Sequence, residues 1–172
     1  MKLEIKGIEK RYGRQSVLKG IELEAHSGTC IGILGGNGCG KSTLLSILAG
    51  VQKPDRGSFV VDGVDMFSDS FAQSRAVGYV PQGTPLMEEL SARDNLRLWY
   101  DKKNLAKELK DGVLAMLGIP EFIKVPVSKM SGGMKKRLSI GCAVANRPPV
   151  LLLDEPGAAL DFLARKKSPN IL

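Results

Sequence analysis

The first sixty residues contain short stretches in which apolar and polar positions alternate. Residues 3–6 and 18–25 alternate in this way, and residues 59–61 form a short run of aromatic and β-branched side chains. Successive side chains of a strand point to opposite faces, so alternation predicts strands with one buried face. Glycine-containing turns separate the stretches, and we therefore predict an antiparallel β layer.

Two other runs are almost continuously apolar and do not alternate. They occupy residues 29–34 and residues 150–155, and each is typical of a short strand that is buried on both faces. Directly after the first run come a glycine-rich loop and a helical pattern over residues 41–49, which is expected to stop at Gly50. The order is thus strand, glycine loop, helix.

The middle of the chain has mostly helical spacing of apolar residues. A strand is predicted over residues 76–80, and helices are predicted over 91–100 and 105–117. Ser91 is a suitable N-cap for the first of these helices, and Gly118 a suitable stop for the second. Residues 83–145 are therefore predicted to form a mainly helical segment.

Composition and charge narrow the class of protein without giving its function. At 172 residues and 43% hydrophobic residues, the chain is long enough for one domain with a real core. A net charge of +7 suits an anionic partner such as a nucleotide, a nucleic acid or a lipid surface, but it equally suits a plain basic protein. The N-terminus lacks the pattern of a signal peptide, and no apolar run is long enough to cross a bilayer.

The cysteines and the one histidine do not suggest a structural metal site. Cys30, Cys39 and Cys142 have no paired Cys-x-x-Cys spacing, and His26 has no suitable metal-ligand companions nearby in the sequence. We therefore expect a protein of the reducing cytoplasm, in which any contact with a membrane is made through a partner.

The glycine-rich loop fits the phosphate-binding pattern G-x-x-x-x-G-K-[ST] at every fixed position. Glycines let successive backbone N–H groups turn toward phosphate oxygens, and the helix that follows adds its positive end. Lys41 is expected to reach the β and γ phosphates, and the Ser42 hydroxyl to bind Mg²⁺. The alternative is an ordinary glycine-rich turn between a strand and a helix. The predicted nucleotide-binding residues are Gly35, Gly36, Asn37, Gly38, Cys39, Gly40, Lys41, Ser42 and Thr43.

Hydrolysis of a triphosphate also needs a carboxylate near the metal and a group that orients the attacking water. Asp154 and Glu155 follow the apolar run 150–153, and we predict Asp154 as the metal-side carboxylate and Glu155 as the group that polarises the water. Alone, an apolar run that ends in Asp-Glu more often marks a strand meeting solvent. Together with the glycine loop, the pair predicts a nucleotide hydrolase.

A third short motif lies between these two. Ser131 is predicted as a helix N-cap, with Gly132 and Gly133 in the first helical turn, where exposed N–H groups face an anion. A plain capped helix with a basic surface is the alternative interpretation of this segment.

Taken in order, these motifs resemble the nucleotide-binding domain of the ATP-binding cassette (ABC) ATPases. The order is an early aromatic residue (Tyr12), the glycine loop, a glutamine after a strand (Gln82), a Ser-Gly-Gly signature at 130–134, the Asp-Glu strand at 150–155 and Ala-Ala-Leu-Asp at 158–161. The resemblance covers nearly the whole chain, residues 1–172, as a single domain. It implies an α/β fold: a P-loop NTPase (RecA-like) core over 1–82 and 146–172, with an antiparallel β layer and an inserted helical subdomain over 83–145.

The resemblance also implies roles for residues that the motifs alone do not explain. Tyr12 would stack on the adenine of ATP, and Gln82 would contact Mg²⁺ or the attacking water. The signature would contact the γ phosphate held by the opposite subunit of a head-to-tail dimer, and Asp161 would lie at the dimer interface. The signature residues are Ser131, Gly132, Gly133 and Met134.

The sequence departs from the family pattern in two places. Met130 and Met134 stand where leucine and glutamine are commonest, so the signature is expected to bind the γ phosphate with altered strength. In the family a histidine and further strands follow the Asp-Glu strand, whereas this sequence ends at Leu172. We therefore expect an incomplete core that lacks its C-terminal part.

The leading hypothesis is the energy-coupling ATPase of an ABC transporter, with ATP and Mg²⁺ as cofactors. It would act on the cytoplasmic face of a membrane through permease subunits, as a homo- or heterodimer, and without nucleic acid. Two alternatives remain: a nucleotide-binding module with little or no turnover, and a soluble ABC ATPase that acts outside transport. The sequence gives neither the cargo nor the direction of transport.

Overall fold

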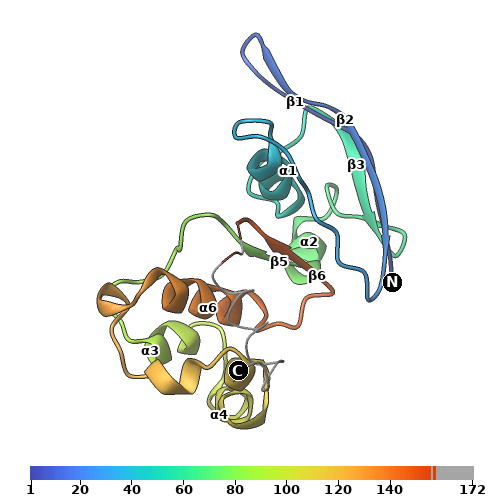
Figure 1. Cartoon of the computed structure of the whole chain (residues 1–172). Helices are drawn as coiled ribbons and strands as arrows, with labels where there is room; N and C mark the ends of the chain where they lie inside the picture. Colours follow the sequence, from blue (N-terminus) through green and yellow to red (C-terminus); the bar gives the residue numbers. More distant parts are fainter. Residues whose placement is uncertain (156, 158–172) are drawn as a thin grey trace, which may run out of the picture. The chain divides into compact units, whose positions relative to one another are not determined.

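The structure is a computed structural model that describes residues 1–155 and 157. The chain divides into two compact units. Unit 1 comprises Met1–Tyr79 with Pro148–Asp154, and unit 2 comprises Val80–Arg147 with, among the described residues, Glu155 and Gly157. Figure 1 labels most of the elements of both units.

Unit 1 contains a four-stranded antiparallel sheet in the order β2-β1-β3-β4. Its strands are β1 (Lys2–Tyr12), β2 (Gln15–His26), β3 (Arg56–Val61) and β4 (Val64–Asp65). Leu3 pairs with Ala25 on one side and with Val61 on the other, which fixes the register. The antiparallel layer predicted from the alternating stretches is thus confirmed, with longer strands than the stretches themselves.

One face of this sheet packs against helix α1 (Lys41–Leu48). The helix agrees with the predicted helix over residues 41–49. Ala49 is its C-cap, and Gly50 follows with a φ of 76°. Burial of apolar side chains on this face is the main stabilising contribution in unit 1. The core comprises Leu3, Ile5, Ile8, Leu18, Leu44, Ile47, Leu48, Phe59, Val61, Met66, Val77 and Val150.

A second, two-stranded sheet pairs β5 (Val77–Val80) with β6 (Val150–Leu153). Helix α2 (Ser70–Ala76) precedes β5, and its Gln73 side chain donates hydrogen bonds to the carbonyls of Ile47 and Leu48 at the end of α1. The prediction of a strand over residues 150–155 that is buried on both faces was only partly right, since the strand ends at Leu153 and Leu151 is 40% exposed.

The predicted strand at residues 29–34 is wrong. These residues adopt no regular structure and are exposed, with Leu34 94% exposed. Their composition suits a buried strand, but a strand also needs neighbours that satisfy its backbone N–H and C=O groups. Within the described part of the chain, no strand pairs with this run.

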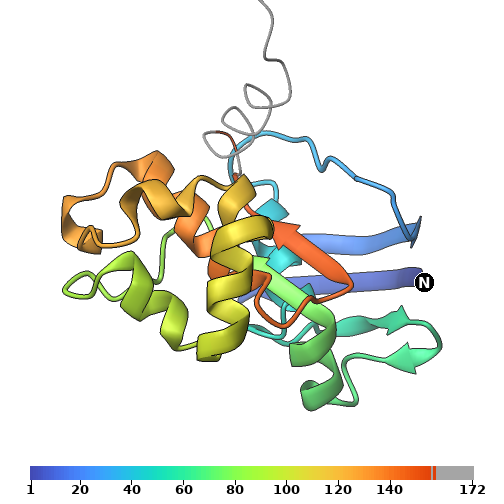
Figure 2. The ribbon, with the colours of Figure 1, turned by 90° about the horizontal axis from the view of Figure 1, so that it is seen from below.

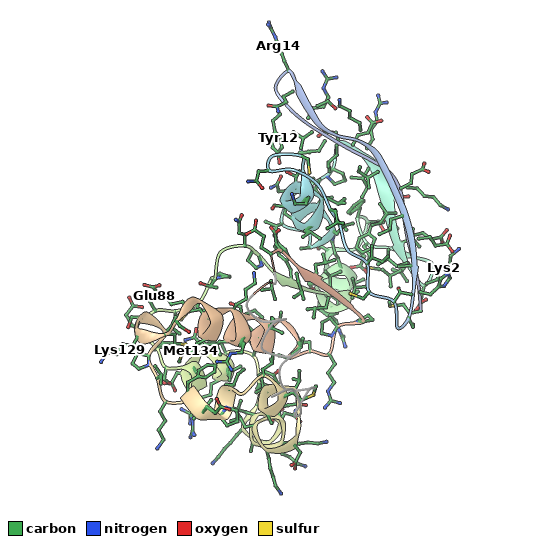
Figure 3. All side chains as sticks on the ribbon, viewed as in Figure 1. Lys2, Tyr12, Arg14, Glu88, Lys129 and Met134 are labelled. Carbon is green, nitrogen blue, oxygen red and sulfur yellow. The ribbon has the colours of Figure 1, made fainter. Side chains whose placement is uncertain are left out.

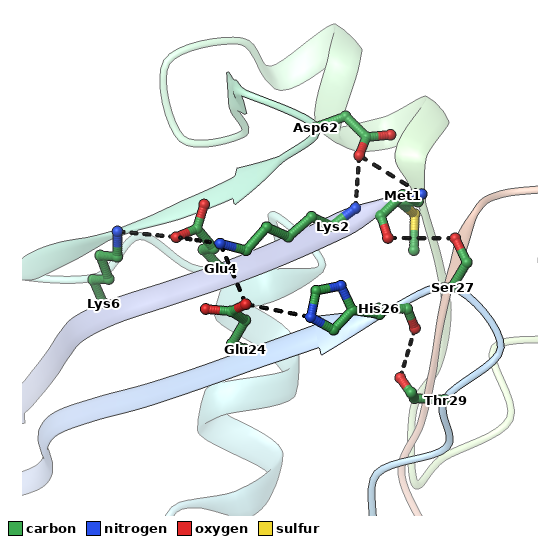
Figure 4. A network of polar contacts seen from close by, with 9 residues as sticks. All are labelled: Met1, Lys2, Glu4, Lys6, Glu24, His26, Ser27, Thr29 and Asp62. Atoms are coloured by element: carbon green, nitrogen blue, oxygen red, sulfur yellow. Dashed lines mark hydrogen bonds and ion pairs between the residues drawn. The ribbon is translucent and has the colours of Figure 1, made fainter.

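The outward polar positions of β1 and β2 form a network of ion pairs (Figure 4). The Lys2 ammonium lies 3.4 Å from Glu4 and 3.2 Å from Glu24, and His26 lies 3.3 Å from Glu24. Exposed pairs of this kind contribute little to stability, because solvent screens them. His26 therefore belongs to a solvated pair at the end of a strand.

Unit 2 is built from short helices that can be followed in Figure 2. They are α3 (Ala92–Arg97), α4 (Lys102–Asp111), α5 (Val113–Met116), α6 (Gly132–Ala143) and two 3₁₀ turns, Ile119–Phe122 and Val127–Lys129. Ser91 caps α3 as predicted, accepting a hydrogen bond from the Asp94 N–H. Gly118 has a φ of 66° and follows α5 closely.

The single helix predicted over residues 105–117 is in fact two helices. The break falls at Gly112, where the backbone is extended and the Glu108 carboxylate accepts a hydrogen bond of 2.8 Å from the Val113 N–H. Glu108 also pairs with Arg147 at 3.1 Å. These hydrogen bonds hold the pKa of Glu108 below its usual value, the backbone N–H of Val113 having the larger effect.

Helix α6 packs closely on its neighbours at Gly141. A Cβ atom there would lie 2.8 Å from Leu114 and 2.9 Å from Ile119. The Tyr100 hydroxyl donates a 2.8 Å hydrogen bond to the Gly141 carbonyl, and burial raises the pKa of Tyr100.

Among the described residues, no helix has both the length and the apolar content that a bilayer crossing requires.

Gly57 provides a test of the sheet of unit 1. It has a φ of 100°, and a Cβ atom there would lie 2.6 Å from the Gly7 carbonyl oxygen of the neighbouring strand. Gly57→Ala should therefore lower the free energy of unfolding by about 1–3 kcal/mol in urea titrations. Gly63→Ala is the control, because Gly63 has a φ of 83° but open space around it. Equal losses in the two variants would contradict the role assigned to close strand packing.

Candidate functional site: a nucleotide-binding cassette

The phosphate-binding loop of unit 1 leads directly into α1. Gly38 and Gly40 have φ values of 78° and 99°, a left-handed conformation that favours glycine. Gly40 is the N-cap of α1 and supplies no side-chain hydrogen bond, and the first turn contains no acidic residue. The amino end of α1 therefore keeps its positive partial charge and its outward N–H groups, which together suit an anion.

Gly40 is also required by its surroundings. A Cβ atom there would lie 2.9 Å from side-chain atoms of both Val17 and Leu18, and 3.3 Å from the Val17 carbonyl oxygen. The loop is thus pressed against β2 at the point where the helix begins. Any larger residue would displace the Val17 and Leu18 side chains or move the amino end of α1.

The Lys41 side chain folds back over this loop. Its ammonium donates hydrogen bonds of 2.7 Å to the Gly35 carbonyl and 2.9 Å to the Gly36 carbonyl, and it lies 3.9 Å from the Cys39 sulfur. Four of the predicted nucleotide-binding residues are thus brought together. The lysine adds a full positive charge where the loop N–H groups already favour an anion.

Tyr12 lies at the end of β1, and its side chain is 48% exposed (Figure 3). The hydroxyl donates a hydrogen bond to the side-chain carbonyl of Gln52, and the Lys10 ammonium lies 5.7 Å from the ring centroid. Asp55 anchors this strand end by accepting hydrogen bonds from the Arg11 N–H at 2.7 Å and from Lys10 at 3.2 Å. The exposed ring, whose hydroxyl is held by Gln52, suits stacking on a planar ligand.

Asp154 follows β6 and is 4% exposed. It lies near Tyr79 of β5, whose pKa is raised first by burial and second by the charge of Asp154. Its carboxylate and the Ser42 hydroxyl are hard oxygen donors of the kind that Mg²⁺ prefers. The residues of unit 1 thus fit a magnesium ion in their donor chemistry.

Unit 2 brings together the two predicted catalytic residues. The Gln82 side-chain amide donates a 3.0 Å hydrogen bond to Oε2 of Glu155, across 73 positions of sequence. Both side chains are exposed. Glu155 has a φ of 50°, which is uncommon for a residue other than glycine. Strained positions of this kind often occur at functional sites.

The signature segment forms the amino end of α6. Ser131 is the N-cap and accepts a 3.3 Å hydrogen bond from the Met134 N–H, with Gly132 and Gly133 opening the helix. Met130 is buried, whereas Met134 is half-buried. The capped helix predicted here is therefore confirmed, and the phosphate-binding role of the segment stays a prediction.

Lys136 is a residue that the sequence analysis missed. It is only 7% exposed, and its ammonium donates a 2.9 Å hydrogen bond to the Pro81 carbonyl, directly before Gln82. In the sequence it belongs to a basic run that suggested a solvated surface. Its helical spacing from Ile140, four positions on and also buried, could have indicated an inward face.

The predicted interface residue Asp161, together with the rest of residues 158–161, lies outside the described residues. The other predicted site residues are divided between the units. Residues 35–43, Tyr12 and Asp154 belong to unit 1, whereas Gln82, Glu155 and the signature belong to unit 2.

The chain belongs to the ABC transporter family, whose domain matches residues 18–158. It is 35% identical over 167 residues to the linearmycin resistance ATP-binding protein LnrL of Bacillus subtilis, covering 95% of this chain and 54% of that protein. It is 34% identical over 171 residues to the probable multidrug ABC transporter ATP-binding protein YbhF of Escherichia coli, covering 96% and 30%. It is 38% identical over 168 residues to the taurine import ATP-binding protein TauB of Pseudomonas aeruginosa, covering 95% and 62%. The chain thus spans between 30% and 62% of these three relatives.

Solved structures show the same fold. An ATP-binding subunit of an ABC transporter superposes with a TM-score of 0.81 at 26% identity, covering 97% of this chain and 73% of that one. The ATP-binding cassette MJ0796, solved as a dimer in a post-hydrolysis state with ADP and Pi, superposes with a TM-score of 0.79 at 25% identity, covering 95% and 80%. The predicted α/β fold of a P-loop NTPase with an antiparallel layer is therefore confirmed.

The cap of α6 gives a test of the signature segment. Ser131→Ala removes the side-chain acceptor for the Met134 N–H and should lower the free energy of unfolding by about 1 kcal/mol. Ser131→Asp is the matched control, because its carboxylate can accept the same hydrogen bond and suits a helix amino end. Urea unfolding of the three proteins checks this. A loss in Ser131→Asp as large as that in Ser131→Ala would show that the cap does not stabilise the helix.

Proposed function

We propose that this chain is the nucleotide-binding domain of an ABC transporter ATPase, which binds and hydrolyses ATP to drive transport through membrane-spanning partners. The Gln82–Glu155 hydrogen bond of 3.0 Å carries the hydrolytic part of the proposal. It joins a residue after β5 to one after β6, and the sequence motifs predict a catalytic role for both. The phosphate loop and the family membership support the nucleotide-binding part.

Unit 1 would bind the phosphates and the metal. Backbone N–H groups of the loop and the amino end of α1 would face the phosphate oxygens, and Lys41 would move from the loop carbonyls onto the β and γ phosphates. Ser42 and Asp154 would hold Mg²⁺, with Gln82 as a further oxygen donor in the bound state. When bound, the ion would neutralise negative charge that develops on the phosphates. Tyr12 would stack on the adenine.

Glu155 would act on the attacking water. Because Gln82 holds Oε2 of the carboxylate, Oε1 is the oxygen that would accept a proton as the water adds to the γ phosphorus. The bond from that phosphorus to the β-γ bridging oxygen breaks, which gives ADP and inorganic phosphate. The roles of Glu155 and Gln82 are thus those of a base and of the group that orients it.

The signature and Asp161 would belong to a head-to-tail dimer. Ser131 and the N–H groups of Gly132 and Gly133, with Met134 beside them, would complete the phosphate shell of the partner subunit. A related cassette has been solved as a dimer with ADP and Pi, which supports this arrangement. ATP would then hold two subunits together, and its hydrolysis would release them.

The transported substrate is not set by this chain. The relatives include a taurine import protein and resistance proteins for linearmycin and daunorubicin, so similarity favours neither direction of transport. We propose that cargo and direction are set by permease subunits, to which the domain binds at the cytoplasmic face of the membrane.

Lys41 tests the phosphate-binding step. Lys41→Ala should weaken the affinity for MgATP by about 100-fold, because it removes charge-assisted hydrogen bonds to the phosphates. Isothermal titration calorimetry measures the affinity. Lys19→Ala removes the same charge from an exposed position of β2 and should bind as the unchanged protein does. If the two variants bound ATP equally well, the phosphate-binding role of the loop would be wrong.

Glu155 tests the hydrolytic step. Glu155→Gln keeps the size of the side chain but removes the base, so kcat should fall by about 100-fold to 10,000-fold while ATP still binds. Phosphate release and ATP binding are measured on the same samples, with Glu121→Gln as a control at an exposed site. Binding without turnover in the unchanged chain would favour the nucleotide-binding module over the ATPase. A loss of binding in Glu155→Gln would contradict the role of Glu155.

A further inference from the structure

Lys136 is a buried cation in the second turn of α6. Its side chain is 7% exposed, although lysine is almost never buried without polar partners. The ammonium donates a 2.9 Å hydrogen bond to the carbonyl oxygen of Pro81. A charged donor in a buried setting forms a stronger hydrogen bond than a neutral or solvated one. This contact therefore holds the Pro81 carbonyl firmly.

The held carbonyl belongs to the peptide group that joins Pro81 to Gln82. Because a peptide group is planar, fixing its carbonyl oxygen also restrains the Gln82 nitrogen and Cα, from which the Gln82 side chain extends. The Gln82 side chain then donates its 3.0 Å hydrogen bond to Glu155. A chain of contacts thus runs from α6, through one peptide group and one amide, to the proposed base.

A neighbouring contact helps to separate this role from general packing. Lys135, the preceding residue of α6, pairs with Glu88 at 3.0 Å, and the Ser128 N–H donates to the Glu88 carbonyl at 2.9 Å. Figure 3 labels Glu88 and also Met134, the residue of α6 that precedes Lys135. Lys136 thus contacts the start of residues 81–88, and Lys135 contacts their end. The Glu88 side chain is 64% exposed, so its ion pair contributes little.

We propose that Lys136 is a positioning residue for hydrolysis, which sets Gln82 against Glu155 from the signature helix. The proposal rests on the proposed function, in which Glu155 is the base. In this role Lys136 acts through the Pro81–Gln82 peptide. The two hydrogen bonds thus connect the signature helix to the Gln82–Glu155 pair within unit 2.

Turnover kinetics test the proposal. Lys136→Met keeps the length of the side chain but removes the donor, and it should lower kcat by about 10-fold or more while the KM for ATP stays within about twofold. Lys135→Met is the matched control and should leave both constants within about twofold. Lys136→Arg keeps a charged donor and should recover part of the loss. Equal kcat values for Lys136→Met and Lys135→Met would overturn the proposal.

A milder variant guards against failure to fold. Lys136→Gln keeps a polar side chain, but its amide nitrogen is one bond closer to the backbone and does not reach Pro81 at hydrogen-bond distance. It should lower kcat in the same direction as Lys136→Met. The proposal would be overturned if kcat in Lys136→Gln were unchanged and the NMR signals of its Gln82 side-chain amide did not shift.

A double-mutant cycle asks whether Lys136 acts through Gln82. If it does, Lys136→Met combined with Gln82→Ala should be no slower than Gln82→Ala alone. Multiplied losses in kcat would show that Lys136 acts by another route, and they would overturn the proposal.

A structural measurement separates this inference from the proposed function. In ¹⁵N-labelled protein, the Gln82 side-chain amide signals, assigned through Gln82→Ala, should shift in Lys136→Met and stay in place in Lys135→Met. This readout needs no turnover. Absent hydrolysis with a selective Gln82 shift would reject the proposed function alone, whereas hydrolysis with an unmoved Gln82 signal would reject the positioning role alone.

Discussion

The close approach of the phosphate loop to β2 at Gly40 is the constraint on which the candidate site depends. A left-handed N-cap with no side chain lets α1 begin against Val17 and Leu18 without a clash. The same feature leaves the helix amino end without a side-chain cap. A bound anion would satisfy the outward N–H groups. One glycine thus links the packing of the β layer to the chemistry of the loop.

Other residues of unit 1 contact α1 along its buried face and at its carboxyl end. Apolar side chains of α1 are buried against β1, β2 and β3, and Gln73 donates to the carbonyls at the far end of the helix. Unit 2 supplies the residues proposed to act on water, Glu155 and Gln82, and Lys136 of α6 is hydrogen-bonded to the residue before Gln82. Binding chemistry and hydrolytic chemistry therefore depend on different local supports.

Much of the local structure could be predicted because it depends on neighbouring residues. Alternation gave the antiparallel layer, and Ser91, Ser131 and Gly50 marked helix ends correctly. The failures arise where specific hydrogen-bond partners decide, because periodicity does not show them. Residues 29–34 have the composition of a strand but pair with none in the described part of the chain, and the Glu108 carboxylate at Gly112 ends a helix that apolar spacing alone would continue. Lys136 was missed because its partner, Pro81, is 55 positions away.

The most direct test of the account is whether this chain recognises nucleotides by their phosphates. Isothermal titration calorimetry with MgATP, MgADP and AMP measures this on one preparation. The account predicts that ATP and ADP bind, and that AMP, which lacks the β and γ phosphates held by the loop and Lys41, binds at least about 10-fold more weakly. Equal affinity for all three nucleotides would contradict it, because binding would then depend on the base and sugar alone.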